Sequence, residues 1–279
     1  MSARPAGLPE FANPPLVEVA LSVQFAPLAK LRSAQIGALW AAIFRRDFPR
    51  TEEHMPLPAS REEFDRGVAP SVRVEFSDRP PVPRFWFLNE AGTELVQVQQ
   101  DRFTRNWRKV GEGDAYPRYE RIREAFGGNL AALEGFLRQE ELGELVIGQC
   151  EITYVNHVLV GDDQPVGHVA QLERLLALLR PGCARLDSGG TLDDLTVRAR
   201  YTFREAAGTP IGRLHVDAEP GTRRSDGRSL VVLKLTARGK PEGAGIEESL
   251  RFLDRGREWV GRAFLEVTLP EIQAFWSRP

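Results

Sequence analysis

Residues 18–25 read Glu-Val-Ala-Leu-Ser-Val-Gln-Phe, and residues 151–158 read Glu-Ile-Thr-Tyr-Val-Asn-His-Val. A short helical pattern opening on Ala-Gln and an aliphatic residue follows each stretch, and a longer helical pattern closes each half of the chain. The matching segments lie 133, 136 and 138 residues apart, in the same order along the chain: 18–25 with 151–158, 34–36 with 170–172, and 120–126 with 258–264. Offsets this similar predict one structural unit that occurs twice, with small insertions in its loops.

The two halves share one predicted plan, which is α+β. In residues 17–25 apolar and polar side chains alternate, as in a strand with one buried face. Each half then reads as strand, helix, three or four antiparallel strands and long helix. We divide the chain into an irregular lead-in at residues 1–15, a first repeat at 16–145 and a second repeat at 146–279. An antiparallel sheet with one solvated face and helices on the other is the expected architecture.

Proline and glycine interrupt this plan in two places. Residues 49–70 contain four prolines and a glycine and are predicted to form a loop with little regular structure, followed by a strand at 72–76. The helical pattern that starts at Tyr119 is expected to break at residues 127–129, Gly-Gly-Asn, and to resume at Leu130.

Two arrangements of the halves stay open. They can pair edge to edge into one saddle-like sheet, which resembles the fold plan of the TATA-binding-protein class at the level of fold alone. The rival is a single helix-grip sheet that wraps around the last helix and encloses a ligand cavity.

Composition sets limits on the class of protein. The 279 residues are 42% hydrophobic and 27% charged, which predicts a packed globular protein. A net charge of −2 argues against a general polyanion binder. No run approaches the roughly 20 apolar residues of a membrane span, and residues 1–9 lack an apolar signal core, so we expect a cytoplasmic protein with no membrane contact. Cys150 and Cys183 form no pair motif and are expected to be thiols.

Five stretches of the chain form a recognisable pattern: Asn-Pro-Pro-Leu-Val-Glu at 13–18, Gln-Val-Gln-Gln-Asp-Arg-Phe at 97–103, Asn-Trp-Arg at 106–108, Tyr-Pro-Arg-Tyr at 116–119 and Cys-Glu-Ile-Thr-Tyr-Val-Asn-His at 150–157. Together they are similar to a sporadically distributed family of uncharacterised prokaryotic proteins. Phe264, Thr268 and Trp276 fit the end of the family pattern, and Arg257 stands where relatives are expected to have His. The resemblance spans nearly the whole chain and implies no reaction, because no activity is established for the family.

The cluster Asn106-Trp107-Arg108 is the first candidate site. Strand alternation places Asn106 and Arg108 on one face and Trp107 on the other. Arg108 is suited to grip a carboxylate or phosphate that Asn106 orients. The alternative is that Trp107 is core and the polar pair faces water or pairs with Asp101 or Glu94.

The strand at 151–157 supplies the second group of candidates. Glu151 and His157 share one face, while Tyr154 and Asn156 share the other and can cross-link the two halves by hydrogen bonds. Glu18 and Glu151 occupy the same place in the two repeats. They are therefore candidates for an acid/base pair near a pseudo-twofold axis, or for a shared structural contact.

Signatures of catalysis and of cofactors are missing from the sequence. The four histidines show no ligand spacing, so no metal site is expected. No phosphate-binding loop and no nucleophile elbow occurs, so we expect no cofactor and assign no catalytic residue.

Charge is distributed unevenly. Residues 192–240 carry ten Lys and Arg against six Asp and Glu. Arg198, Arg200 and Arg204 share one strand parity and can project with Arg102 or Arg108 from the open sheet face, where aromatic neighbours would complete a single-strand stacking platform. The alternative to a nucleic-acid platform is a solvated sheet face with scattered salt bridges.

These observations favour a non-catalytic binding or accessory protein that holds a protein or peptide partner on its sheet face or in the cleft between the repeats. One alternative is a nucleic-acid-binding protein that uses the basic strands. The other is a small-ligand-binding protein or enzyme with a cavity between the sheet and the long helices.

Overall fold

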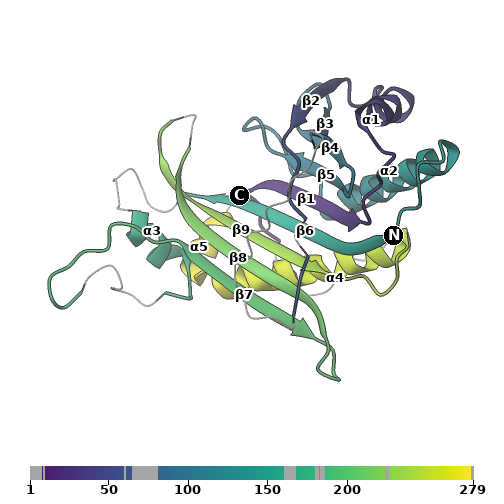
Figure 1. Ribbon diagram of the computed structural model, residues 1–279. Coiled ribbons are helices and arrows are strands. Elements are labelled where there is room, and N and C mark those ends of the chain that lie inside the picture. Colours follow the sequence, from purple (N-terminus) through teal and green to yellow (C-terminus); the bar gives the residue numbers. More distant parts are fainter. Residues whose placement is uncertain are drawn as a thin grey trace.

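One antiparallel sheet of nine strands forms the centre of the computed structural model (Figure 1), which describes residues 8, 10–59, 61–64, 81–159, 168–179, 182, 186–223 and 226–277. The strand order is β2-β3-β4-β5-β1-β6-β9-β8-β7. The strands are β1 (Leu16–Phe25), β2 (Arg50–His54), β3 (Arg84–Leu88), β4 (Glu94–Gln99), β5 (Arg102–Arg108), β6 (Ile147–Val158), β7 (Val197–Arg204), β8 (Pro210–Thr222) and β9 (Ser229–Gly239). The helices are α1 (Ser33–Leu39), which continues as the π-helical turn η1 (Trp40–Phe44), α2 (Tyr119–Gln139), α3 (His168–Leu175), α4 (Ile246–Val267) and α5 (Pro270–Trp276).

The first strand of each half lies at the middle of the sheet. β1 pairs with β6, and the remaining strands of each half extend outward from this pair. We call the face of the sheet that the helices leave uncovered the open face. Corresponding pairs of residues occur there in the two halves, since Glu18 lies opposite Arg108 and Glu151 lies opposite Arg238. The two halves therefore form one continuous sheet. The common origin of the halves stays a prediction.

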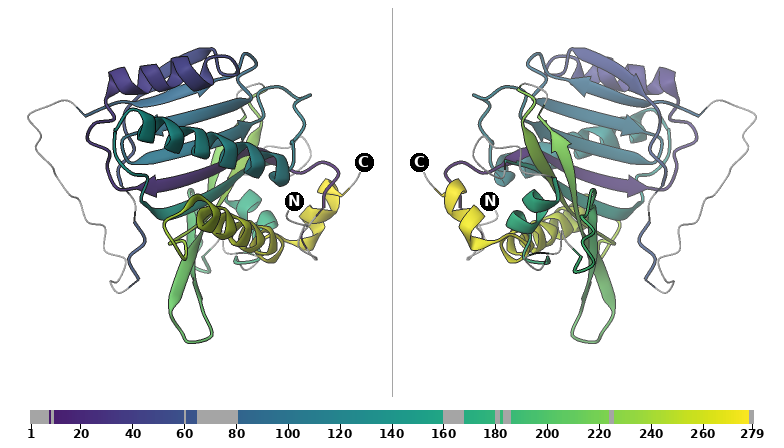
Figure 2. Two further views of the ribbon diagram at one scale, coloured as in Figure 1. Left: turned by 90° about the vertical axis from the view of Figure 1, so that its right-hand side faces the viewer. Right: turned by 90° about the vertical axis from the view of Figure 1, so that its left-hand side faces the viewer.

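Helices cover one face of this sheet. α2 packs on β5 and β1, α4 packs on β6 and β9, and α3 packs on β9 and β8. Figure 2 shows α2 and α4 next to each other on the same side. The cover is shared by helices from both halves, so the sheet does not wrap around the last helix alone.

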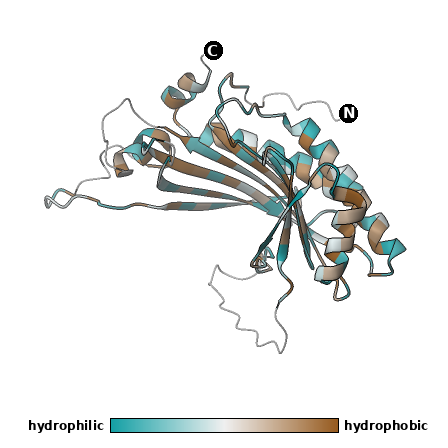
Figure 3. Ribbon diagram, turned by 90° about the horizontal axis from the view of Figure 1, so that it is seen from above, coloured by the Kyte–Doolittle hydropathy of each residue, from teal (hydrophilic) through white to brown (hydrophobic). Residues whose placement is uncertain are grey.

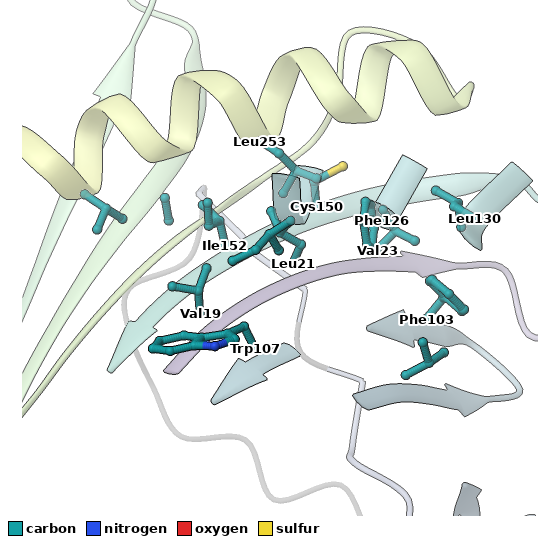
Figure 4. Packing of buried hydrophobic residues seen from close by; sticks show 14 of the residues in the cluster. Val19, Leu21, Val23, Phe103, Trp107, Phe126, Leu130, Cys150, Ile152 and Leu253 are labelled. Carbon is teal, nitrogen blue, oxygen red and sulfur yellow. The ribbon is translucent and has the colours of Figure 1, made fainter. Parts of the chain in front are cut away.

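The alternation in β1 sets the two faces. Val19, Leu21 and Val23 point to the helices and are fully buried. Ile152 on β6 and Leu253 on α4 belong to the same apolar layer (Figure 4). In Figure 3 brown apolar and teal polar segments alternate along the strands, as expected of a sheet with one face covered by helices.

The predicted loop at 49–70 is wrong in its first part, because residues 50–54 form β2. Among the described strands it pairs with β3 alone, and it exposes most of its polar side chains, so it lacks the apolar alternation by which a strand is recognised. The strand expected at 72–76 lies outside the described residues.

The predicted break in α2 is also wrong, because the helix is continuous through Gly127 and Gly128. A Cβ on Gly127 would lie 3.2 Å from Leu250 Cδ1 of α4, so the glycine allows two long helices to approach closely. The helix also continues through Asn129. The side chain of Asn129 binds the sheet, because its Oδ1 accepts a hydrogen bond from Arg105 Nη1 of β5 at 2.5 Å.

Among the helices of the described residues, none has the length and the apolar content that crossing a membrane requires.

Candidate functional site

A cavity of about 410 Å³ lies on the helix side of the sheet, between the two halves. We call it the inter-half cavity. β6 contributes Tyr154 and Asn156 to its wall, and the loop before α2 contributes Tyr116. α4 contributes Arg257 and Phe264. The cavity therefore forms where the first repeat's α2 region faces the second repeat's β6 and α4.

The end of the lead-in segment closes one side of the inter-half cavity, with Pro14 and Pro15 in the wall beside Leu16 of β1. The ring of Phe11 packs edge-on against Phe264 at 6.0 Å and against Trp276 at 5.5 Å. The His157 backbone N–H donates to the Pro15 carbonyl at 2.8 Å. These contacts make residues 11–15 a fixed part of the cavity wall.

Tyrosine hydroxyl groups form the polar part of the inter-half cavity. The Tyr116 and Tyr154 hydroxyl oxygens lie 3.4 Å apart, a contact that joins the two halves. Burial raises the pKa of Tyr154, and burial together with the neighbouring Tyr154 raises the pKa of Tyr116 well above its ordinary value. Both phenols therefore stay neutral near pH 7 and can donate hydrogen bonds.

Besides Arg118, the cavity wall contains a second cationic group, Arg257. Its Nη1 lies 2.8 Å from Glu120 Oε1, and its guanidinium lies 4.5 Å from the centre of the Tyr119 ring. The Tyr119 hydroxyl donates to Asp254 Oδ1 at 2.8 Å, which ties the start of α2 to α4. The aromatic ring and the carboxylate thus hold the guanidinium at the polar part of the cavity.

The backbone before α2 is strained at the cavity. Arg118 has φ 71° and ψ 152°, a region that is essentially restricted to glycine. Its side chain lies 3.5 Å from Glu10 of the lead-in segment. Such a conformation costs on the order of 1–3 kcal/mol and persists where the surrounding contacts fix it. Tyr116 precedes Arg118 and Tyr119 follows it, and the side chains of both tyrosines line the inter-half cavity.

Asn106 and Arg108 lie on the open face as expected, but their polar atoms are engaged within the sheet. Asn106 Nδ2 donates to Glu18 Oε1 at 2.5 Å, and Asn106 Oδ1 accepts from Gln97 at 2.7 Å. Arg108 Nε donates to the Gly92 carbonyl at 2.7 Å. Trp107 is buried. The expected partners Asp101 and Glu94 are not the ones used, and a recognition role for the pair stays a prediction.

Glu18 and Glu151 do not form a pair. Four residues along the paired strands separate them, on the order of 13 Å at the usual rise per residue. Glu18 bonds Asn106, whereas Glu151 accepts from Arg238 Nε at 2.5 Å. The two carboxylates therefore do not meet as an acid/base pair, and each instead bonds a side chain of a neighbouring strand, as the alternative of a shared structural contact expects.

The other candidates on β6 separate by face. Asn156 is buried on the helix side and donates from Nδ2 to the Leu233 carbonyl at 3.2 Å, within its own half. Tyr154 makes the predicted bond between the halves. His157 is exposed on the open face, opposite Val232.

The basic strands are less positive than their sequence suggests. Arg198 Nε lies 3.1 Å from Asp217, and Arg204 Nη1 donates to the Gly208 carbonyl at a hairpin end. Arg200 is exposed opposite His215. Arg102 is buried and donates to the Pro58 carbonyl at 3.1 Å. A nucleic-acid platform would need these cations to be free and to point outward together.

No cluster of three or more His, Cys, Asp and Glu side chains that suits a metal ion occurs in the described part of the chain. Burial raises the pKa of the Cys150 thiol to about 12, so this group is not a reactive thiolate. Cys183 lies outside the described residues.

The sequence left a cavity between the sheet and the long helices open as an alternative, but it did not identify most of the residues that line it. Tyr116 entered only through the family resemblance, Tyr119 through the resemblance and as the start of a helix, and Arg257 only as a departure from the family pattern. A usable signal was present, because the stretches 13–18, 116–119 and 150–157 all contribute cavity residues. Their side chains come from elements more than 30 residues apart, and periodicity does not bring such elements together.

Comparisons with known proteins identify no family for this chain. No protein-family model matches the chain, and no curated protein matches it. The crystal structure of the di-domain ARO/CYC StfQ from the steffimycin biosynthetic pathway covers 70% of this chain and 74% of its own, with 11% identity and a TM-score of 0.23. A similarity this low carries no argument about fold or function. The family resemblance stays a prediction.

Proposed function

We propose that the protein binds a small amphipathic molecule in the inter-half cavity. The observation that carries the proposal is the convergence of three distant sequence stretches, 13–18, 116–119 and 150–157, on one cavity of about 410 Å³. This volume lies within the roughly 300–1,000 Å³ range of small-molecule sites. The proposal replaces a partner on the Asn106–Arg108 face as the leading hypothesis, because Asn106 already bonds Glu18 and Arg108 already bonds the Gly92 carbonyl.

The chemistry of the wall defines the ligand class. Leu16, Val260 and Phe264 offer an apolar surface for a hydrocarbon or aromatic body. The neutral phenols of Tyr116 and Tyr154 donate hydrogen bonds. A carbonyl or carboxylate oxygen is the matching acceptor, and the nearby guanidinium of Arg257 favours an anionic one. The proposal includes no reaction.

Ligand binding can be measured with a fluorescent aromatic sulfonate, and dodecanoate can then be used to displace it. Tyr154→Phe removes one donor and keeps the ring, so affinity should fall about 2- to 10-fold, the value of one hydrogen bond. Val260→Trp fills the cavity and should abolish binding. Tyr201→Phe is the matched control, because Tyr201 is exposed on β7, and it should leave affinity unchanged.

Circular dichroism must show that the Val260→Trp protein is folded. Probe binding that Tyr154→Phe and Val260→Trp both leave at the wild-type level would place the probe outside the cavity and refute the proposal. Failure of both the aromatic sulfonate and dodecanoate to bind the wild-type protein would also refute the proposal.

A protein or peptide partner on the open face stays the second candidate. It is supported by a specific observation, which is that this face already holds an extended segment of the chain itself.

A further inference from the structure

Residues 55–64 cross the open face after the end of β2, and we call them the strap; residue 60 is not described. The strap is bound through its main chain. The Leu57 N–H donates to Gln99 Oε1 at 3.0 Å, and Gln99 Nε2 donates to the Leu57 carbonyl at 3.0 Å. One glutamine amide thus pairs with both backbone groups of one residue, as a neighbouring strand would.

Three further side chains of the sheet bind strap backbone, one of them Arg213 of β8, whose Nη2 donates to the Glu63 carbonyl at 3.4 Å. Gln149 Oε1 accepts from the Glu62 N–H at 2.8 Å, and Arg102 Nη2 donates to the Pro58 carbonyl at 3.1 Å. Gln99, Gln149 and Arg102 come from β4, β6 and β5. The open face therefore carries a row of groups that recognise an extended peptide regardless of its side chains.

One strap side chain occupies a specific pocket. The Glu62 side chain is only 6% exposed. Its Oε1 lies 2.6 Å from His215 Nε2 and 3.3 Å from Arg238 Nη1, and its Oε2 lies 2.7 Å from Arg213 Nη1. Burial acts to raise the pKa of Glu62, but the His215 hydrogen bond and the charges of Arg238 and Arg213 outweigh burial and lower it. The pocket thus accepts one ionised carboxylate.

The rest of the strap contributes little to the core. Met55 is 79% exposed, and Leu57 is 36% exposed. Hydrogen bonds and one carboxylate hold the strap, while the apolar layer lies on the other side of the sheet. The half-buried ring of Phe64 adds one contact, since the Arg213 guanidinium lies 4.9 Å from its centre. A competing segment therefore needs to replace these polar contacts and one aromatic contact, and no part of the apolar layer.

We propose that the open face is a docking surface for an extended peptide segment of a partner protein that carries a glutamate, and that the strap is its built-in occupant. This inference is independent of the inter-half cavity. Glutamine amides match a peptide backbone, which offers both a donor and an acceptor, whereas phosphate offers only acceptors. The carboxylate pocket is a single site flanked by Glu151 and Asp217, unlike the continuous basic track that a nucleic acid needs.

The test uses the full-length chain and a labelled peptide with the sequence of residues 55–64. In the Glu62→Ala chain the strap loses its carboxylate, so the pocket becomes free for the peptide. Fluorescence anisotropy should show at least 10-fold tighter peptide binding to this variant than to the wild-type chain. In the wild-type chain the tethered strap competes at a high effective concentration.

Three controls make the result specific. Glu63→Ala removes the adjacent exposed carboxylate and should behave as wild type. A peptide with Glu62→Gln should bind the Glu62→Ala chain at least 10-fold more weakly, and so should the normal peptide when Arg213→Ala is added to that chain. If the Glu62→Ala chain does not fold, the milder Glu62→Gln chain takes its place.

Equal peptide binding to the variant and wild-type chains, or no binding to either, would overturn the proposal. A single-stranded oligonucleotide that binds the Glu62→Ala chain more tightly than the peptide does would overturn it in favour of a polyanion.

Discussion

Substitution of Gly256 by alanine tests how closely α4 lies on the sheet. An ideal Cβ on Gly256 would lie 2.7 Å from Ile152 Cγ2 and 3.3 Å from Ala237 Cβ. Alanine gains about 1 kcal/mol of helix propensity, but overpacking of this kind costs about 1–3 kcal/mol. Gly135→Ala is the matched control, because no atom lies within 4 Å of the added Cβ in α2. That variant should receive the propensity gain alone.

The difference in unfolding free energy between the two variants isolates the contact. We expect Gly256→Ala to be less stable than Gly135→Ala by about 1–3 kcal/mol, the overpacking term. In thermal unfolding followed by circular dichroism this amounts to roughly 2–10 °C for a chain of this size. Because Arg257 follows directly, the shift of α4 should also weaken probe binding in the inter-half cavity. Equal melting temperatures for the two variants would refute the close approach of α4 to β6 and β9.

Three further predictions concern charged groups. The folded pKa of Glu62 lies below its ordinary 4.5, so its stabilisation is present above that pH and is lost as pH falls through the folded value; the stability difference between wild type and Glu62→Gln should shrink on acidification. The pKa of Glu18 is shifted in the opposite direction, because burial raises it despite the Asn106 hydrogen bond. The ionised form of Glu18 therefore destabilises the folded state, and Glu18→Gln should raise the melting temperature more at pH 8 than at pH 4. Arg105→Ala should lower the free energy of unfolding by about 2–4 kcal/mol, because it leaves the Glu94 carboxylate without its ion-pair partner. In a double-mutant cycle measured by urea unfolding, adding Glu94→Ala should lower the stability little further, and additive effects would argue against the pair.

Candidate site residues were harder to predict than strands. The alternation around Trp107 correctly separated its face from that of Asn106 and Arg108, because alternation is a local property of a strand. It did not reveal that Asn106 bonds Glu18 from the neighbouring β1, which follows from strand order. Most of the lining of the inter-half cavity escaped prediction for the same reason, since Tyr116 and Arg257 meet only after α2 and α4 are placed.

The sequence by itself determined the α+β class, the central strands, the long helices and the buried face of β1, because each depends on periodicities within about 20 residues. Only the tertiary structure decided the pairing of β1 with β6, the continuity of α2 through Gly127 and the position of the strap on the open face. Each of these depends on contacts between residues far apart in the chain, such as Gly127 with Leu250 and Glu62 with Arg213. Local sequence does not encode such contacts, because the free energy that favours them arises only when both partners are already in place.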